Sequence, residues 1–197
     1  MKPKILQLIC RFSLLTLAGG LLSQCAHEPV TQANASNASR RQISADSRAA
    51  LNSLYAQNPT AKRLGNRASG ILVFPHVAKG GFVFGAEGGN GALFGSDGGT
   101  RAYYQTAGAS WGLQAGVQKY GYALFLMNKQ EVANLDQAGG WAVGSSPSLV
   151  VVDKGVGSEM TTKNMSKGTY AFIFDQKGLM GGLGLKGTKI TRIHPGP

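Results

Sequence analysis

The stretch from residue 59 to residue 95 constrains the fold more than any other part of the chain. It reads PTAKRLGNRASGILVFPHVAKGGFVFGAEGGNGALFG, so a short basic segment leads into an apolar run and then into aromatic residues interrupted by glycine. Asn58 is a favourable N-cap, and Pro59 suits the first helical position because an amide there would have no partner in the helix. This order predicts a helix that leads directly into a β-sheet.

The predicted helix has two different faces. At about 100° per residue, Ala61, Leu64 and Ala68 fall in one narrow arc that can pack against a sheet. A second arc holds the basic side chains of Lys62, Arg63 and Arg67. One face therefore packs and the other is cationic, with an ordinary solvated helix surface as the alternative interpretation of the charged face.

Two strands are predicted after this helix. Residues 71–74 are all apolar, which is typical of a strand buried on both faces, and we expect Pro75 to end it. Phe82 and Phe84 then share one side of a second strand. The glycines that follow indicate turns, bulges or close approach between backbones.

Glycine is unusually frequent in the chain as a whole. It supplies 29 of 197 residues, about double its average usage of roughly 7%. The glycines follow no strict period and are accompanied by aromatic and β-branched residues, which argues against collagen and against disorder. We interpret them as a mark of bulged and sharply turned strands.

Two more helices and several strands are predicted along the chain. Ser44 can cap a first helix, and Asn128 can cap another over residues 129–138, with Glu131 placed as in a capping box. Residues 111–117 alternate apolar and polar side chains, as a half-buried strand does. The other predicted strands cover residues 102–106, 122–127, 141–143 and 149–152. The end of the chain is predicted as a hairpin-like meander, in which 170–174 leads through a turn at 175–178 into a returning segment at 179–185, followed by a last strand at 189–193.

Together these elements predict one α+β domain. It is a bulged antiparallel β-sheet curled into a sandwich or small barrel, with two N-terminal helices and one internal helix. The aromatic stripe of residues 170, 172 and 174 is interpreted as core, with membrane contact as the alternative.

The first 25 residues are typical of an export signal. Basic residues precede an uncharged core over residues 12–22, which is too short to span a membrane. Residues 22–25, Leu-Ser-Gln-Cys, resemble a lipobox, in which Cys25 becomes the lipid anchor, although Gln24 departs from the usual small residue. An ordinary secretory leader with a free Cys25 thiol is the alternative. We predict a signal peptide over residues 1–25, a flexible tether over 26–43 and the folded domain over 44–194.

Three segments of the chain resemble the SYLF domain, a lipid-binding module with an N-terminal helix before a β-rich body. They are NPTAKRLGNRASGILVFPHVAKGGFVFG at 58–85, GASWGLQAGVQKYGYALFLM at 108–127 and AFIFDQKGLMGGLGLKGTKIT at 171–191. The later two are most similar to the bacterial lipoprotein branch. Residues 103–105 and 174–175 depart from the Trp-Ser-x-Pro and Tyr-Ser segments common in the wider family.

The resemblance implies a set of lipid-headgroup ligands. The N-terminal helical region of SYLF domains is implicated in contacting anionic headgroups, and Lys62, Arg63 and Arg67 occupy that region. Lys79, in the expected turn after the first strand, joins them. Some eukaryotic relatives also bind actin, but an exported bacterial protein would not meet actin, so that partner is not carried over.

The net charge supports an anionic partner. The chain has 20 basic and 9 acidic residues, a formal charge of +11, which favours membrane headgroups or nucleic acid. An exported protein rarely meets nucleic acid, and the chain shows no groove of alternating basic and aromatic residues. We therefore expect an anionic phospholipid membrane as the partner, no nucleic acid, and a location in the bacterial cell envelope with the anchor in the outer membrane and the domain in the periplasm.

One motif raises the possibility of an esterase. Residues 108–112, Gly-Ala-Ser-Trp-Gly, match G-x-S-x-G, and Asp136, Asp153 or Asp175 followed by His194 preserves the order of a catalytic triad. The motif requires a helix after the serine. The pattern after Ser110 predicts a strand instead, so the esterase is a remote alternative.

Other chemical motifs are weaker still. Residues 182–187 match G-x-G-x-x-G, but no helix is predicted after them to bind a phosphate. His27, His76 and His194 are isolated from other metal-ligating residues. We therefore predict no enzyme, no cofactor and no metal.

Two non-enzymatic alternatives remain beside lipid binding. One is a structural or protein-interaction lipoprotein of the envelope without specific lipid recognition. The other is a small outer-membrane barrel, which is disfavoured because the apolar runs at 71–74 and 149–152 do not alternate as a barrel wall must.

Overall fold

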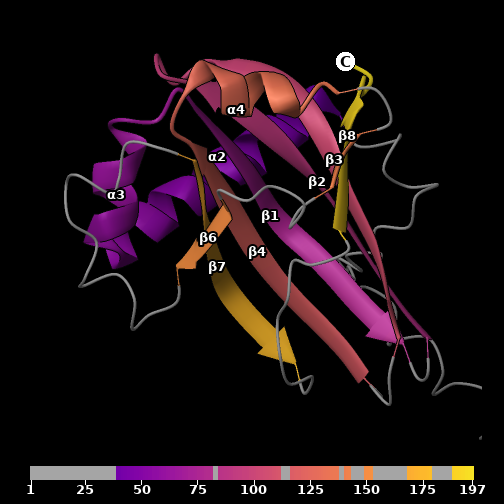
Figure 1. Ribbon diagram of the computed structural model, residues 1–197. Helices are drawn as coiled ribbons and strands as arrows, with labels where there is room; N and C mark the ends of the chain where they lie inside the picture. The colour runs from indigo at the N-terminus through magenta and orange to yellow at the C-terminus, as the bar shows by residue number, and fades with distance from the viewer. Residues whose placement is uncertain are drawn as a thin grey trace, which may run out of the picture.

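The structure is a computed structural model that describes residues 39–81, 84–111, 116–137, 140–142, 149–152, 168–178 and 188–197. The described strands form a single curled sheet of eight strands (Figure 1). Their spatial order is β5-β8-β3-β2-β1-β4-β7-β6, and every neighbouring pair is antiparallel except β6 and β7. The strands are β1 (Gly70–Gly81), β2 (Phe84–Gly95), β3 (Thr100–Trp111), β4 (Gly116–Leu126), β5 (Trp141–Ala142), β6 (Leu149–Val152), β7 (Thr169–Gly178) and β8 (Thr188–Ile193).

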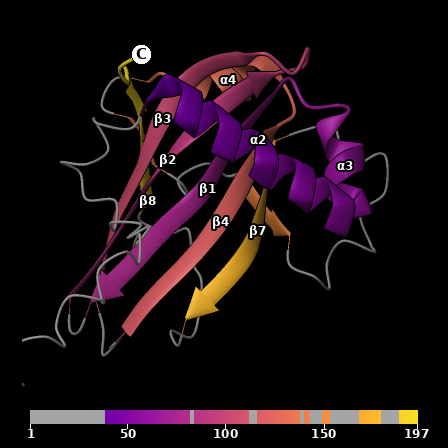
Figure 2. The same ribbon diagram turned by 180° about the vertical axis from the view of Figure 1, so that it is seen from behind.

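Three helices in the described ranges cover the sheet from two sides. Helices α2 (Arg40–Gln57) and α3 (Pro59–Gly65) lie across one face, as Figure 2 shows, while α4 (Lys129–Asn134) lies on the other face (Figure 1). The predicted α+β class, with a curled antiparallel sheet, two N-terminal helices and one internal helix, is confirmed. None of the helices in these ranges has the length and apolar character that a membrane crossing needs.

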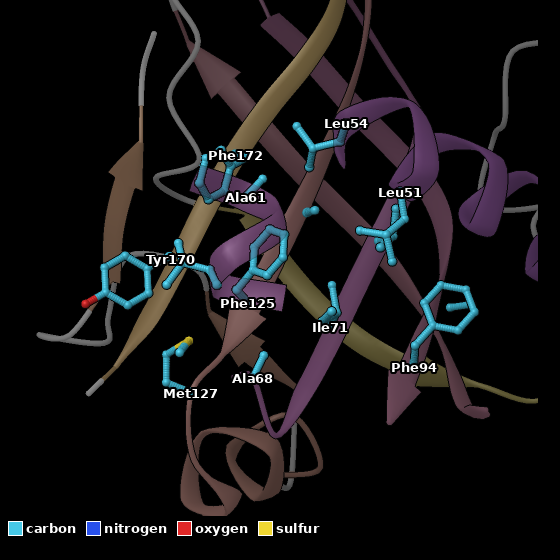
Figure 3. Packing of buried hydrophobic residues seen from close by; sticks show 14 of the residues in the cluster. Leu51, Leu54, Ala61, Ala68, Ile71, Phe94, Phe125, Met127, Tyr170 and Phe172 are labelled. Atoms are coloured by element: carbon cyan, nitrogen blue, oxygen red, sulfur yellow. The ribbon is translucent and has the colours of Figure 1, made fainter. Parts of the chain in front are cut away.

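Because side chains alternate along each strand, the sheet has two separate buried faces. The face under α2 and α3, here called the α2 face, is an apolar cluster (Figure 3). It includes Leu51, Leu54, Ala61, Leu64, Ile71, Phe94, Phe125, Tyr170 and Phe172. The opposite face, here called the tyrosine face, includes Leu72, Phe74, Val77, Leu93, Tyr104, Tyr120, Tyr122, Leu124, Leu135, Trp141 and Ile190. The predicted aromatic stripe of residues 170 and 172 is therefore core.

The helix starts show which local signals were informative. Asn58 caps α3, because its Oδ1 accepts hydrogen bonds from the backbone amides of Thr60 and Ala61 at 3.0 and 3.1 Å. Asn128 caps α4, which ends at Asn134 rather than at 138. The predicted Ser44 cap is wrong, because α2 begins at Arg40 with Ser39 as its N-cap. Residues 40–43 are therefore helix rather than tether, and residues 1–38 lie outside the described part of the chain.

Pro75 does not end the first strand. β1 continues to Gly81, and its register against both neighbours shifts around Pro75 and His76. A bulge places the proline where a ladder hydrogen bond is not needed. Gly91 of β2 makes this arrangement possible, since a Cβ there would meet the carbonyl oxygen of Val73 and lie 2.7 Å from the Phe74 ring.

Two predicted connections are also wrong. Residues 111–117 are not one strand, because Trp111 ends β3 and Gly116 begins β4, with β2 and β1 lying between these strands in the sheet. The predicted return strand over residues 179–185 lies outside the described residues, while β7 pairs with β4 and β8 pairs with β3. Residues 175–178, the expected turn, continue β7. Sequence periodicity carries no information about such distant pairings.

Candidate functional site

Helix α3 separates an apolar face from a cationic one, as its periodicity predicts. Ala61 and Leu64 are fully buried on the α2 face, and the next turn buries Ala68. Three basic side chains next to these buried residues are all exposed, two on α3 and one just after its end, and we call them the α3 patch: Lys62, Arg63 and Arg67. The short helix is held in place by its Asn58 cap and by its packing, so the patch has a defined position at the far end of α2.

The α3 patch is not neutralised by carboxylates within the described ranges. The ion pairs found there join Arg101 to Asp97 at 2.6 Å and Arg192 to Asp136 at 3.0 Å. Arg63 donates one hydrogen bond to Thr60 Oγ1 at 2.8 Å, which leaves its charge uncompensated. Lys62 and Arg63 lie in the last turn of α3, where positive charge interacts favourably with the helix dipole. These two residues therefore also stabilise the helix.

Other cations of the helical layer have structural partners. Arg48 on α2 donates to the carbonyl oxygen of Gly98 at 2.7 Å, and its guanidinium carbon lies 4.6 Å from the centre of the Phe94 ring. Arg40 contacts the carbonyl oxygen of Gly196 through its backbone amide and its side chain. These two arginines fasten α2 to the sheet and to the C-terminal end, unlike those of the α3 patch.

Lys79 does not lie near the α3 patch. It sits on β1 on the tyrosine face, nine positions after Gly70, and only 7% of it is exposed. Its cross-strand neighbours are Glu87 on β2 and Gln118 on β4. The α3 patch lies on the other side of the sheet, so the structure separates the four residues that sequence analysis grouped as headgroup ligands into three and one.

The described part of the tyrosine face carries three hydrogen-bonded polar clusters that involve tyrosines. Tyr120 donates to Glu87 Oε2 at 3.0 Å, and Thr188 donates to Glu87 Oε1 at 2.6 Å. The other two clusters join Tyr122 to Thr106 at 2.7 Å and Tyr104 to Asp136 at 2.8 Å. Glu87 and Gln118 were not predicted as site residues, because each is isolated in a glycine-rich or alternating segment and only the strand register brings them together.

Burial shapes the acid–base behaviour of these tyrosines. Desolvation raises the pKa of Tyr122 well above its usual value, and it raises the pKa of Tyr120 and Tyr104 in the same direction, with the carboxylates of Glu87 and Asp136 adding to the effect. On the α2 side, burial raises the pKa of Tyr55 to about 12. All four phenols therefore stay protonated at physiological pH.

The esterase triad is not assembled. Ser110 lies within β3 opposite Gly85, and His194 follows the last residue of β8, which pairs with Tyr103. The seven residue-to-residue steps from position 103 to position 110 span about 24 Å of strand. Asp136 accepts hydrogen bonds from Tyr104 and Arg192. Asp175 lies on β7, which is separated from β3 in the sheet by β2, β1 and β4. Asp153 and residues 182–187 lie outside the described residues, as do Cys25 and His27.

No group of three or more metal-ligating side chains occurs in the described part of the chain. His76 is exposed at the β1 bulge, and His194 is exposed beyond β8.

Comparison with known proteins connects the C-terminal half of the chain with a family. Residues 107–194 match the model of the Ysc84 family, whose description is Las17-binding protein actin regulator. No curated protein matches the chain. The matched region runs from within β3 to the residue after β8, so it includes the internal helix, and α2, α3, β1 and β2 lie before it.

Proposed function

Residues 107–194 belong to the Ysc84 (SYLF) family, and from this premise we propose that the chain is a non-enzymatic envelope lipoprotein whose domain engages anionic phospholipid through the α3 patch. The family is associated with lipid binding and actin regulation and is not a known enzyme family. The observation that carries the proposal is the α3 patch itself: three exposed cations without a carboxylate partner among the described residues.

The free energy of binding between the α3 patch and an anionic bilayer is small. Each basic side chain near an anionic bilayer contributes about 1 kcal/mol, so three contribute about 3 kcal/mol, which is weak for a free domain. A lipid anchor at Cys25 would raise the local concentration of the domain at the membrane. In this proposal the anchor keeps the domain at the outer membrane, in the periplasm, and the α3 patch sets its orientation.

The position of α2 fits that division of labour. Its 18 residues span about 27 Å, with Ser39 at one end and α3 just beyond the other. Both ends lie on the same face of the sheet, as Figure 2 shows. A flexible tether of residues 26–38 would reach roughly 20 Å. If Cys25 is anchored in the membrane, the tether would reach the domain at Ser39, and the α3 patch could contact the membrane that holds the anchor.

The test is flotation with vesicles of phosphatidylglycerol and phosphatidylcholine, using chain from residue 26 onward so that no anchor contributes. We expect the wild type to float with phosphatidylglycerol and the triple variant Lys62→Glu, Arg63→Glu, Arg67→Glu to stay behind. A matched control carries the same charge change at exposed lysines of the sheet: Lys119→Glu, Lys177→Glu and Lys189→Glu. Equal flotation of wild type and the α3 triple variant would refute the proposal. Equal loss of flotation in both triple variants would show that vesicle binding depends on the net charge of the domain and not on the position of the α3 patch.

The anchor is tested separately. We expect mass spectrometry of the mature protein to find a diacylglyceryl group on an N-terminal Cys25. An unmodified N-terminus at another residue would leave the domain soluble and would remove the orientation argument.

A second candidate function is protein interaction in the envelope, and the family description favours it because it names a binding protein. Chemical crosslinking in intact cells would distinguish the two. A stoichiometric protein partner that survives the α3 triple variant, with no preference of the domain for anionic vesicles, would support this second candidate.

A further inference from the structure

Helix α2 covers only part of the sheet face on which it packs. Figure 2 shows α2 crossing the strands near one end, while β1, β4 and β7 extend beyond it. The apolar cluster under the helices includes Val73 on β1 and Ala92 on β2, yet β1 continues to Gly81 and β2 begins at Phe84. Part of the same face is therefore left without a helix in the described ranges.

A row of cross-strand neighbours crosses this uncovered part. Lys119 precedes Tyr120 and Lys189 precedes Ile190, and both of the following residues belong to the tyrosine face. Because side chains alternate along a strand, the two lysines point to the α2 side. The strand registers place the whole row on that side, and from β7 to β8 it reads Lys177, Lys119, Ala78, Gly88, Ala107 and Lys189.

A second row lies next to the first, toward the ends of the strands. It consists of Val117, Gly80, Ala86 and Ala109 on β4, β1, β2 and β3. Ala86 and Ala109 are exposed, and Val117 is 64% exposed. The two rows, here called the open face, form a surface of small apolar residues with lysines at its two sides.

The lysines of the open face are arranged as a pair and a single residue. Lys119 and Lys177 are directly opposite each other on β4 and β7, which is unfavourable for two like charges. Lys189 lies on β8, four strands away from β4, which is about 19 Å along the sheet. All three are exposed, and the ion pairs among the described residues do not include them. The open face is thus complementary to an apolar segment with negative charge at both ends.

An α-helix meets these requirements. α2 already lies across the same sheet face with Leu51 and Leu54 in the apolar cluster, so this face accepts a helix in that direction. Acidic residues 11 or 14 positions apart stand on nearly the same side of a helix, at about 17 or 21 Å from each other. These distances match the separation of the lysines, and the alanines and glycines between the lysines permit close approach of the helix.

Two other occupants are less compatible with the open face. A bilayer-binding surface carries large apolar side chains such as Trp, Phe or Leu, whereas Val117 is the one large apolar side chain in these two rows. A second copy of the chain would bring more positive charge, since its net charge is +11 and α2 exposes Arg41 and Arg48. Charge complementarity therefore favours an acidic protein segment.

We propose that the open face binds an amphipathic helix of an acidic partner protein. The helix lies across the strands beside α2, with acidic side chains against Lys119 and Lys177 at one end and against Lys189 at the other. This interaction goes beyond lipid binding and uses neither Cys25 nor the α3 patch.

The test is site-specific photocrosslinking in intact cells, with p-benzoylphenylalanine in place of Ala86 or Ala109 of the full chain. Both side chains are exposed on the open face, so neither replacement removes a buried group. We expect a discrete adduct with one protein, and mass spectrometry of the adduct should place the crosslink in an acidic helical segment. The same replacement at Ala133 is the matched control, since Ala133 is exposed on α4 at the other face of the sheet, and it should give no such adduct.

Charge reversal tests the role of the lysines. The triple variant Lys119→Glu, Lys177→Glu, Lys189→Glu should lower the yield of the adduct at least about tenfold, because attraction is replaced by repulsion at both ends of the helix. A synthetic peptide of the crosslinked segment, titrated into the purified domain, should lose affinity in the same variant.

The α3 triple variant separates this proposal from the lipid-binding one. It should keep the adduct and the affinity for the peptide, while the lysine triple variant should keep flotation with phosphatidylglycerol. An adduct with lipid or with a second copy of the chain would overturn the proposal. So would the lack of any adduct at Ala86 and Ala109, or an adduct that survives charge reversal of the lysines.

Discussion

The two faces of the sheet are built from the same strands by opposite means. The α2 face is held by apolar contact, such as the edge-on packing of Phe125 against Phe172 at 5.2 Å between ring centres. The tyrosine face buries hydroxyl and carboxylate groups that satisfy one another, as in the Tyr122 and Thr106 pair. The stability of the α2 face therefore depends on the volume of its buried side chains, and that of the tyrosine face depends on the protonation of its buried groups. Different perturbations should affect one face without the other.

The largest effect is expected at high pH, and it belongs to the tyrosine face. Tyr120 and Tyr122 have raised pKa values in the folded protein, chiefly through desolvation. Below pH of about 10 the unfolded chain also keeps its tyrosines protonated, so stability is unaffected. Above it, the unfolded state loses protons that the folded state retains, and stability falls by about 1.4 kcal/mol per pH unit for each such group.

Circular dichroism melts between pH 8 and pH 11.5 check this prediction. The unfolding temperature should be flat to about pH 10 and then fall steeply. Tyr122→Phe should be less stable at neutral pH, because Thr106 loses its partner, yet show a shallower fall above pH 10. An unchanged slope in that variant would mean that the tyrosine face does not control alkaline unfolding.

Removing volume should affect the α2 face most. Phe125 is fully buried there between Tyr55 and Phe172. Phe125→Ala should lower the free energy of unfolding by about 3–5 kcal/mol, measured by urea denaturation, with no change in the slope of the alkaline transition. A loss below 1 kcal/mol would show that the α2 layer is loosely packed and would weaken the distinction between the faces.

Local sequence signals predicted two of the three described helix starts and the buried run at residues 71–74 correctly. Asn58 with Pro59 and Asn128 act through atoms within three residues, so periodicity and capping chemistry suffice to predict them. Pro75 was misjudged because its tolerance depends on a bulge against β2 and β4, and those partners are distant in sequence. The pairing of β8 with β3 could not be predicted either, since it joins positions 80 to 90 residues apart, from Gly108 with Thr188 to Tyr103 with Ile193.

The candidate sites follow the same rule. The exposure of the α3 patch could be predicted because helical spacing separates its basic residues from the buried Ala61, Leu64 and Ala68. Lys79 was grouped with them because a strand ending at Pro75 would have left it in a turn. The continued β1 instead places it beside Glu87 and Gln118, and only the register of three strands reveals that environment.

A smaller effect is expected where the faces share a constraint, at the β1 bulge. Gly91→Ala would push a methyl group against the Val73 carbonyl and the Phe74 ring. Strain of this kind costs about 1–3 kcal/mol, measured by urea denaturation. Val73 faces α2 and Phe74 faces the tyrosines, so the strain acts on both faces of the sheet. The variant should therefore shift the urea transition and the alkaline transition together. Gly80→Ala is the control, since a Cβ there meets nothing closer than 3.8 Å and should change stability much less.

The smallest effect distinguishes structural from free cations on the α2 side. Arg48→Met removes the bond to the Gly98 carbonyl and the contact with the Phe94 ring. It should lower the free energy of unfolding by about 0.5–1 kcal/mol and leave binding to phosphatidylglycerol vesicles nearly unchanged. Lys62→Met should do the reverse, because Lys62 is exposed and the ion pairs of the described residues do not include it. If both variants weakened vesicle binding equally, the membrane contact would extend along α2 and would not be confined to the α3 patch.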